Sequence, residues 1–299
     1  MFDFLVSSLT VAGIYAMMAY GLNLQAGYAG LLNFGHIAFA GIGAYATGIA
    51  IDALGGSIWV SLLGAAIGMT AAMLLGWLIA RLGRQLGADY WGIATLAIAE
   101  ILRTIATNEG WLTGGAQGIG AIPTLYADLP RPWSAMAFLS FVALAVLAVA
   151  LLCRRLGNGR FGRAIRLMRE EPQLAACMGY NLRTLKSRTI MTGGAITALD
   201  GSIYAHYMSF VGPDYMLASE TFLLWTMLMI GGLGNTLGVI VGVLMVQAAH
   251  ALVPFAKDIF GFDSDIAGAL RLGLIGMVLL MSLLWRSQGL VPERIRRIA

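Results

Sequence analysis

The feature that most constrains this 299-residue chain is a series of apolar stretches. An α-helix needs about 20 apolar residues to cross the hydrocarbon core of a bilayer. Only 11% of the residues are charged, against about 25% in soluble domains, and the mean hydropathy is +0.80. This composition excludes a soluble enzyme, a disordered tail and a nucleic-acid-binding protein. The uninterrupted stretches predict spanning helices at residues 4–24, 57–80, 88–108, 133–152, 187–209 and 269–285.

Two further apolar regions, 25–52 and 219–253, are interrupted by clusters of glycine. We expect helices there to break inside the membrane, which is tolerated only where protein or a polar cavity binds the freed backbone groups. The sequence GLLNFG at 30–35 resembles GLGN at 232–235, and the two interpretations are an internal repeat and a coincidence of composition. The predicted fold class is therefore all-α, a polytopic membrane protein with eight to ten transmembrane helices, two of them broken. The candidates to line a translocation pathway are Gly30, Asn33, Gly35, His36, Gly231, Gly232, Gly234 and Asn235.

Basic residues are concentrated in segments 81–87, 153–188 and 286–299, which hold 15 of the 19 lysines and arginines. Because short cytoplasmic loops are enriched in these residues, the three segments are predicted to be cytoplasmic. Counting spans then places the N-terminus in the periplasm and the C-terminus in the cytoplasm of a bacterial inner membrane. No basic segment precedes the first apolar stretch, so it is predicted to be a retained span. We expect one transmembrane domain over residues 1–299, with a basic cytoplasmic tail at 286–299.

The longest polar stretch, about residues 153–186, is predicted to be a single cytoplasmic loop. Residues 161–170 predict a short amphipathic helix, and Pro172 either interrupts it or starts the next turn. A charged connector would serve only to fix the topology of the chain. A docking element would instead bind a cytoplasmic partner, and the residues alone leave both interpretations open.

Ionisable residues inside spans are costly to insert and need individual explanations. Glu100 and Arg103 are three residues apart on one helical face, so we favour a structural ion pair over a role in the pathway. Asp200 lies in the middle of its span and is assigned either to the pathway or to contacts between helices. Asn33 and His36, beside the first break, are expected to bind freed backbone groups, to line the pathway, or both.

Several kinds of chemistry have no sequence signature here. There is no phosphate-binding loop of the form GxxxxGK[ST], so this chain is not expected to hydrolyse ATP itself. The three histidines are scattered, without an HExxH or CxxC motif, and a metal site is not expected. No GxSxG elbow stands out, which disfavours an intramembrane enzyme. We expect no catalytic residue, metal or cofactor in this chain.

Several segments occur in a characteristic order: GLNLQAGYAGLLNFGHIAFAGIGAYATG, ADYWGIATLAIAEILR, LTGGAQGI, GRAIRLMREEPQLAACMGYNL, and ALDGSIYAHYMSFVGPDYM with the later IGGLGNTLG. Together they resemble the LivM-type permeases of branched-chain amino acid ABC importers. The resemblance covers about residues 15–285. The TLAIAEI and GGAQGI segments resemble the LivM type more than the related LivH type.

The resemblance implies a non-catalytic translocation subunit with several partners. A LivH-like second permease would pair with this chain in the lipid membrane. Two ATPase subunits, similar to LivG and LivF, would dock underneath and bind ATP and Mg²⁺, and a periplasmic binding protein would deliver the substrate. No nucleic acid takes part. Leucine, isoleucine and valine are the implied default substrates, and urea, short amides, other amino acids and aromatic acids are the alternatives.

The resemblance also implies which part of the cytoplasmic loop lies near the ATPase. Family members usually carry a helix-favouring residue where this chain has Pro172, so the coupling helix is expected to start near Gln173. The residues implied at or near the contact are Arg163, Arg166, Arg169, Glu170, Glu171 and Gly179.

Two other classes of protein remain as alternatives. A stand-alone channel or ion-coupled secondary transporter would explain the broken helices but not the long basic loop. A structural scaffold would leave both the breaks and Asp200 unexplained.

Overall fold

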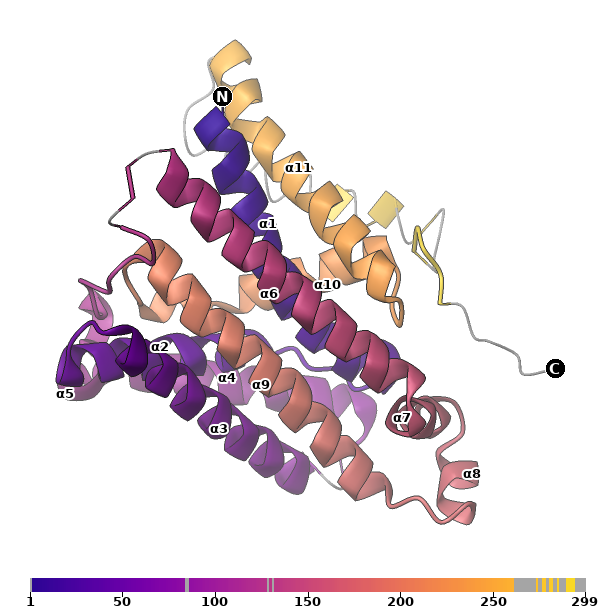
Figure 1. Ribbon diagram of the computed structural model, residues 1–299. Coiled ribbons are helices and arrows are strands. Elements are labelled where there is room, and N and C mark those ends of the chain that lie inside the picture. The colour runs from indigo at the N-terminus through magenta and orange to yellow at the C-terminus, as the bar shows by residue number, and fades with distance from the viewer. Residues whose placement is uncertain are drawn as a thin grey trace.

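The computed structural model describes residues 2–83, 86–127, 129–130 and 132–260, together with 273, 276–277, 280–281, 284 and 289–293. This described part of the chain is helical and contains no β-strand. Figure 1 shows long helices crossing one another, with short helices at their ends. In chain order the elements are α1 (Phe2–Leu22), η1 (Asn23–Tyr28), α2 (Ile37–Leu54), α3 (Ile58–Leu82), α4 (Ala88–Asn108), α5 (Gly110–Thr113), η3 (Gly115–Gln117), α6 (Trp133–Asn158), α7 (Arg160–Glu170), α8 (Pro172–Cys177), α9 (Leu182–Met208), η4 (Pro213–Met216), α10 (Ala218–Gly231) and α11 (Thr236–Phe260).

The long helices coincide with the predicted spans, because a long apolar run is the strongest sequence signal for a spanning helix. Among the described residues, four helices are long and apolar enough to cross a membrane, and the bent pair α10–α11 raises the number to five. The apolar sequence of α4 is interrupted by the charged residues Glu100 and Arg103, and α9 begins with several basic residues. The total of eight to ten segments stays a prediction, and the expected span at 269–285 lies outside the continuously described residues. The four helices are Phe2–Tyr28, Ile37–Leu54, Ile58–Leu82 and Trp133–Asn158.

Helix α3 packs against α2 and α9, with which it lies side by side in Figure 1. Its contact face is a row of buried small residues spaced four apart, and a Cβ added to Gly68 would lie 2.9 Å from Gly43 Cα on α2. Small residues allow the close backbone contacts that hold helices together in lipid. The small residues of the row are Gly64, Gly68, Ala72 and Gly76. Large apolar side chains are exposed elsewhere on α3, as suits contact with lipid: Leu62, Leu63, Ile67, Leu74 and Trp77.

Two interruptions confirm the predicted breaks. Helix α1 continues as the π-helical turn η1 to Tyr28, and the next helix begins only at Ile37. Helices α10 and α11 are separated by residues 232–235, and their axes are bent by 117°. Beyond this bend, α11 packs along α1.

The cytoplasmic loop predicted at 153–186 contains two short helices. Helix α7 confirms the helix expected at 161–170, and Pro172 is the first residue of α8. Proline is well suited to this first position, because its missing N–H would have no partner within the helix. In Figure 1, α7 and α8 lie beside the adjoining ends of α6 and α9, far from α5.

Candidate functional site

The first break, residues 29–36, folds back along the helix that precedes it. Gly30 makes the turn with a positive φ of +67°, which glycine adopts without strain. Leu31 N then donates to Gln25 O at 2.9 Å. Further along, His36 Nε2 lies 3.2 Å from Met18 O. The segment therefore retraces α1, and α2 begins deep inside the protein.

Polar side chains from other helices bind the backbone of this segment. Thr95 Oγ1 on α4 accepts from Phe34 N at 3.1 Å, and Thr221 Oγ1 on α10 accepts from Ile37 N at 3.1 Å. Trp225 Nε1 donates to the Asn33 carbonyl at 3.1 Å. These contacts supply partners for backbone groups that no helix satisfies, while the depth of the break in a membrane stays a prediction.

Asn33 and His36 themselves are buried in the break. Asn33 Oδ1 accepts from Gly35 N at 3.0 Å, and its Nδ2 donates to Gln25 Oε1 at 2.8 Å. His36 Nε2 also lies 2.7 Å from Thr197 Oγ1 on α9. The structure therefore shows the backbone-binding role expected for Asn33 and His36, while a place along a pathway stays a prediction.

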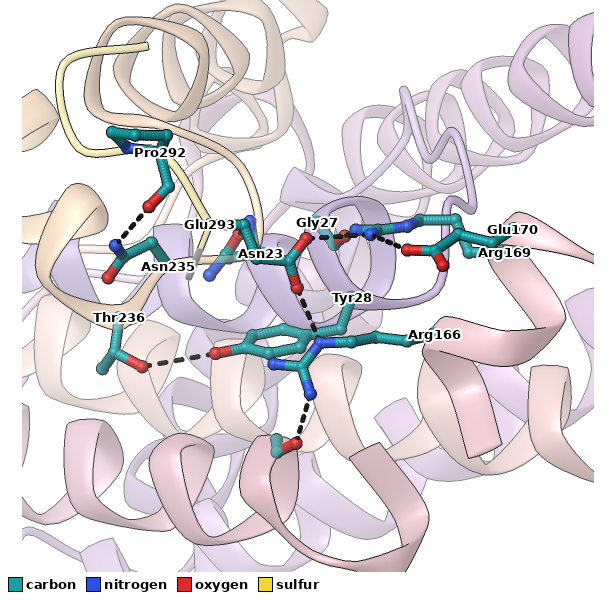
Figure 2. Close-up of polar contacts among 12 residues, drawn as sticks. Asn23, Gly27, Tyr28, Arg166, Arg169, Glu170, Asn235, Thr236, Pro292 and Glu293 are labelled. Atoms are coloured by element: carbon teal, nitrogen blue, oxygen red, sulfur yellow. Dashed lines mark hydrogen bonds and ion pairs between the residues drawn. The ribbon is translucent and has the colours of Figure 1, made fainter. Parts of the chain in front are cut away.

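The second break packs directly against η1 at the end of α1. Gly234 N donates to Asn23 Oδ1 at 2.9 Å. Tyr20 Oη donates to Thr236 O at 2.9 Å, and the hydroxyls of Tyr28 and Thr236 are 3.3 Å apart (Figure 2). The π-helical turn thus lies between the two predicted breaks and joins them.

The two breaks share a local geometry. Gly30 and Gly232 have φ values of +67° and +115°, and each precedes an asparagine by three residues. In both asparagines Oδ1 accepts from the backbone N–H two residues later: Asn33 from Gly35 N, and Asn235 from Leu237 N at 2.9 Å. The resemblance therefore extends to the asparagine contacts but not to the whole backbone, because Gly234 has a φ of +76° and the aligned Leu32 has no positive φ. The internal repeat stays a prediction.

Asp200 lies apart from this polar network. Its side chain is fully buried in α9. Within the part of the chain that the structure describes, neither carboxylate oxygen has a hydrogen-bond partner. Asp200 therefore makes no hydrogen bond between helices there, and its assignment to the pathway stays a prediction.

A cavity of about 70 Å³ lies beside the first break, among α1, α2, α9, η4 and α10. Its polar groups include Glu220, whose Oε2 accepts a 2.7 Å hydrogen bond from Tyr15 Oη. Asp214 and Tyr204 also line it, and Ile37 contributes to the apolar wall. No local sequence motif predicts this cavity, because its lining residues come from five separate segments.

The residues expected near an ATPase fall into two groups. Arg163, Glu170 and Glu171 are exposed, as is Gly179 beyond α8. Arg166 and Arg169 instead point from α7 into the protein and bind Glu293, a residue that the sequence interpretation missed. No local pattern marks this pairing, because 127 and 124 residues separate Glu293 from its partners.

The environment of Arg169 favours its charged form. Burial lowers the pKa of Arg169, but hydrogen bonds to Glu293 and Glu170 outweigh it, so the pKa is raised overall.

The Glu100–Arg103 ion pair expected from the sequence is also present on α4, with Arg103 NH2 2.5 Å from Glu100 Oε1.

This fold defines a class: multi-pass, all-helical membrane proteins whose helices are broken at glycine and asparagine residues. Residues 4–283 match the family described as the permease component of the branched-chain amino acid transport system. The chain therefore belongs to this family of transport permeases.

Named relatives resemble the chain over most of its length. It is 28% identical to the probable branched-chain amino acid transport permease protein LivM of Methanocaldococcus jannaschii, over 94% of this chain and 91% of that one. It is 28% identical to LivM of Escherichia coli strain K12, over 95% of this chain and 69% of that one. It is 26% identical to LivH of Salmonella typhimurium, over 82% of this chain and 83% of that one. No solved structure shows a significant match.

Proposed function

We propose that this chain is the translocation subunit of an ABC importer that moves leucine, isoleucine, valine or a related small solute into the cytoplasm. The observation that carries the proposal is the contact between the two broken helices through Asn23 and Gly234 N, at 2.9 Å. Transporters commonly form their pathway where broken helices of two repeats meet. The names of the relatives support branched-chain amino acids as the substrates. The chain itself is non-catalytic and holds no cofactor.

The proposed partners are a LivH-like permease, two ATPase subunits that hold ATP and Mg²⁺, and a periplasmic binding protein. The exposed end of the α7–α8 region supports the ATPase contact, because Leu174, Met178 and Tyr180 present apolar surface there. The basic segments support a cytoplasmic position for this end and for the C-terminus, with the N-terminus in the periplasm of a bacterial inner membrane.

ATP hydrolysis in the partner subunits powers transport, and ligands that bind the conformations of the permease pair unequally switch it between inward-open and outward-open states. A ligand shifts a conformational equilibrium only by its difference in affinity for the two states. ATP at the docked subunits and the loaded binding protein outside supply these differences. The buried breaks are then where the helices change their arrangement around the substrate.

The first test is purification of the C-terminally tagged chain from its native membrane, with mass spectrometry of its partners. We expect a second permease and two ATPase subunits. Proteoliposomes of that complex, with the binding protein outside, should take up labelled leucine only when ATP is enclosed. Unlabelled isoleucine and valine should compete with leucine, whereas urea should not. Recovery of the chain alone, or uptake without ATP, would refute the proposal.

One observation favours a second candidate, an ion-coupled carrier. Asp200 is buried without a hydrogen-bond partner among the described residues, as a carboxylate that binds a proton or cation during transport would be. This carrier predicts uptake driven by a proton or sodium gradient in the absence of ATP, and loss of that uptake in Asp200→Asn. Gradient-independent uptake would exclude it.

A further inference from the structure

The short segment 289–293 is attached to both sides of the second break. Leu290 N donates to Ile230 O at 2.9 Å, and Val291 N donates to Gly231 O at 3.0 Å. These carbonyls belong to the last turn of α10, where no later helical N–H is available to bind them. On the other side, Asn235 Nδ2 donates to Pro292 O at 3.0 Å (Figure 2).

Glu293, at the end of this segment, connects it to α7. Its Oε1 accepts from Arg166 Nε at 2.6 Å, and its Oε2 accepts from Arg169 NH2 at 2.8 Å. Only 14% of the Glu293 side chain is exposed. Charged hydrogen bonds of this kind are about twice as strong as neutral ones. Arg166, Glu293 and Arg169 together are termed the α7 triad.

The same two arginines also contact the end of η1. The guanidinium carbon of Arg166 lies 4.6 Å from the centre of the Tyr28 ring. Arg169 NH1 donates to the carbonyl oxygen of Gly27, as Figure 2 shows. The triad therefore connects α7 to η1, which precedes the first break, and to the second break.

Arg169 has a second carboxylate within reach. Its NH2 donates to Glu170 Oε1 at 2.9 Å in addition to Glu293. Glu170 is half exposed, so it would remain with Arg169 if α7 moved away from Glu293. Glu170 therefore moves with Arg169 as part of α7, and Glu293 is the member of the triad that links α7 to segment 289–293.

From these contacts we infer that Glu293 is a positioning residue, through which movement of α7 changes the arrangement of residues 232–235. The inference rests on the proposed function, which places an ATPase subunit against the α7–α8 region. When that subunit moves α7, the triad displaces segment 289–293, and this segment moves the end of α10 and Asn235. The alternative is a purely structural role, in which Glu293 holds the same elements together without linking ATP hydrolysis to transport.

The test compares Glu293→Gln with wild type in the complete complex purified with its partners, reconstituted with ATP inside and labelled leucine outside. ATP hydrolysis and leucine uptake are measured on the same vesicles. We expect assembly and hydrolysis within about twofold of wild type. Leucine moved per ATP should fall at least about tenfold, which corresponds to losing one hydrogen bond to a charged group. The matched control is Glu100→Gln, which removes the charge of an exposed carboxylate bound to Arg103 on α4 and should leave the ratio unchanged.

Further variants distinguish transmission of movement through Glu293 from a purely structural role. Arg166→Gln and Arg169→Gln should each lower the ratio, because each removes one of the two charged partners of Glu293. Glu293→Asp keeps the charge but shortens the side chain, so it should assemble with a ratio below that of wild type.

A wild-type ratio in Glu293→Gln, or parallel loss of hydrolysis and uptake, would overturn the inference. So would a Glu293→Gln chain that fails to assemble while Glu293→Asp keeps the wild-type ratio, or failure of both to assemble. A wild-type complex without ATP-dependent uptake would instead refute the proposed function.

Discussion

Gly234 is a position at which a single added methyl group should disturb both the second break and Glu293. Its φ is +76°, and a Cβ placed there would lie 2.7 Å from Glu293 Cδ. The left-handed conformation costs a non-glycine residue about 1–2 kcal/mol. Carbon atoms in contact normally lie about 3.5–4.0 Å apart, so the Glu293 carboxylate would have to move by about 1 Å.

That displacement is large compared with the tolerance of the α7 triad. The bonds from Glu293 to Arg166 and Arg169 are 2.6 and 2.8 Å long. Lengthened by about 1 Å, both would exceed the usual hydrogen-bond limit of about 3.2 Å. Gly234→Ala should therefore assemble but transport poorly, and Gly234→Leu should abolish leucine uptake.

The assay is ATP-driven uptake of labelled leucine, with assembly measured by size-exclusion chromatography. Gly55→Ala is the matched control, because Gly55 also has a positive φ, +91°, but a Cβ there would contact nothing within 4 Å. It should lose stability through strain and keep uptake per assembled complex. Normal uptake by assembled Gly234→Leu would refute both the steric argument and the importance of this break.

Three further substitutions test the packing and the polar contacts. Gly68→Leu should lower the melting temperature of the purified complex, because its Cβ would begin 2.9 Å from Gly43 Cα and overpacking typically costs about 1–3 kcal/mol. Thr95→Val keeps the side-chain shape but removes the acceptor of Phe34 N. It should cost about 1–3 kcal/mol in thermal unfolding for a buried donor left unpaired. Glu100→Gln breaks an exposed ion pair with Arg103 and should leave leucine uptake unchanged.

Two controls make these results specific. Gly110→Leu adds the same side chain where a Cβ would meet nothing within 4 Å, and it should not lower the melting temperature. Thr70→Val removes an exposed hydroxyl that bonds only within its own helix, and it should be nearly neutral. Equal effects in variant and control would contradict the packing and hydrogen-bond explanations. Loss of uptake in Glu100→Gln would instead show that the ion pair takes part in the translocation pathway.

The sequence was sufficient to predict the long helices of the described residues. Apolar stretches of about 20 residues gave helices close to their observed ends, as in α4 at Ala88–Asn108. Glycine clusters located both breaks, and Pro172 marked the start of α8. These signals are local, because length, hydropathy and turn chemistry act within a few residues along the chain.

The arrangement of the site could not be predicted in the same way. Nothing in the sequence around Gly30 indicates that the chain returns along α1, because the direction depends on partners such as Thr95 and Thr221. The family resemblance implied that Arg166 and Arg169 lie at or near an ATPase contact, which stays a prediction. Their contacts with Glu293 depend on how segment 289–293 docks on α10, which no local pattern encodes.

The asparagines at the two breaks show why these breaks persist in a membrane protein. An interrupted helix leaves backbone N–H groups that lipid cannot bind, and each unpaired group is costly. Asn33 and Asn235 each bind the backbone N–H two residues ahead. Asn23, in η1, binds Gly234 N of the second break. Because side chains rather than a continuous helix satisfy these groups, the breaks can change shape by exchanging partners. A continuous helix would have to rupture its own hydrogen bonds to make the same movement.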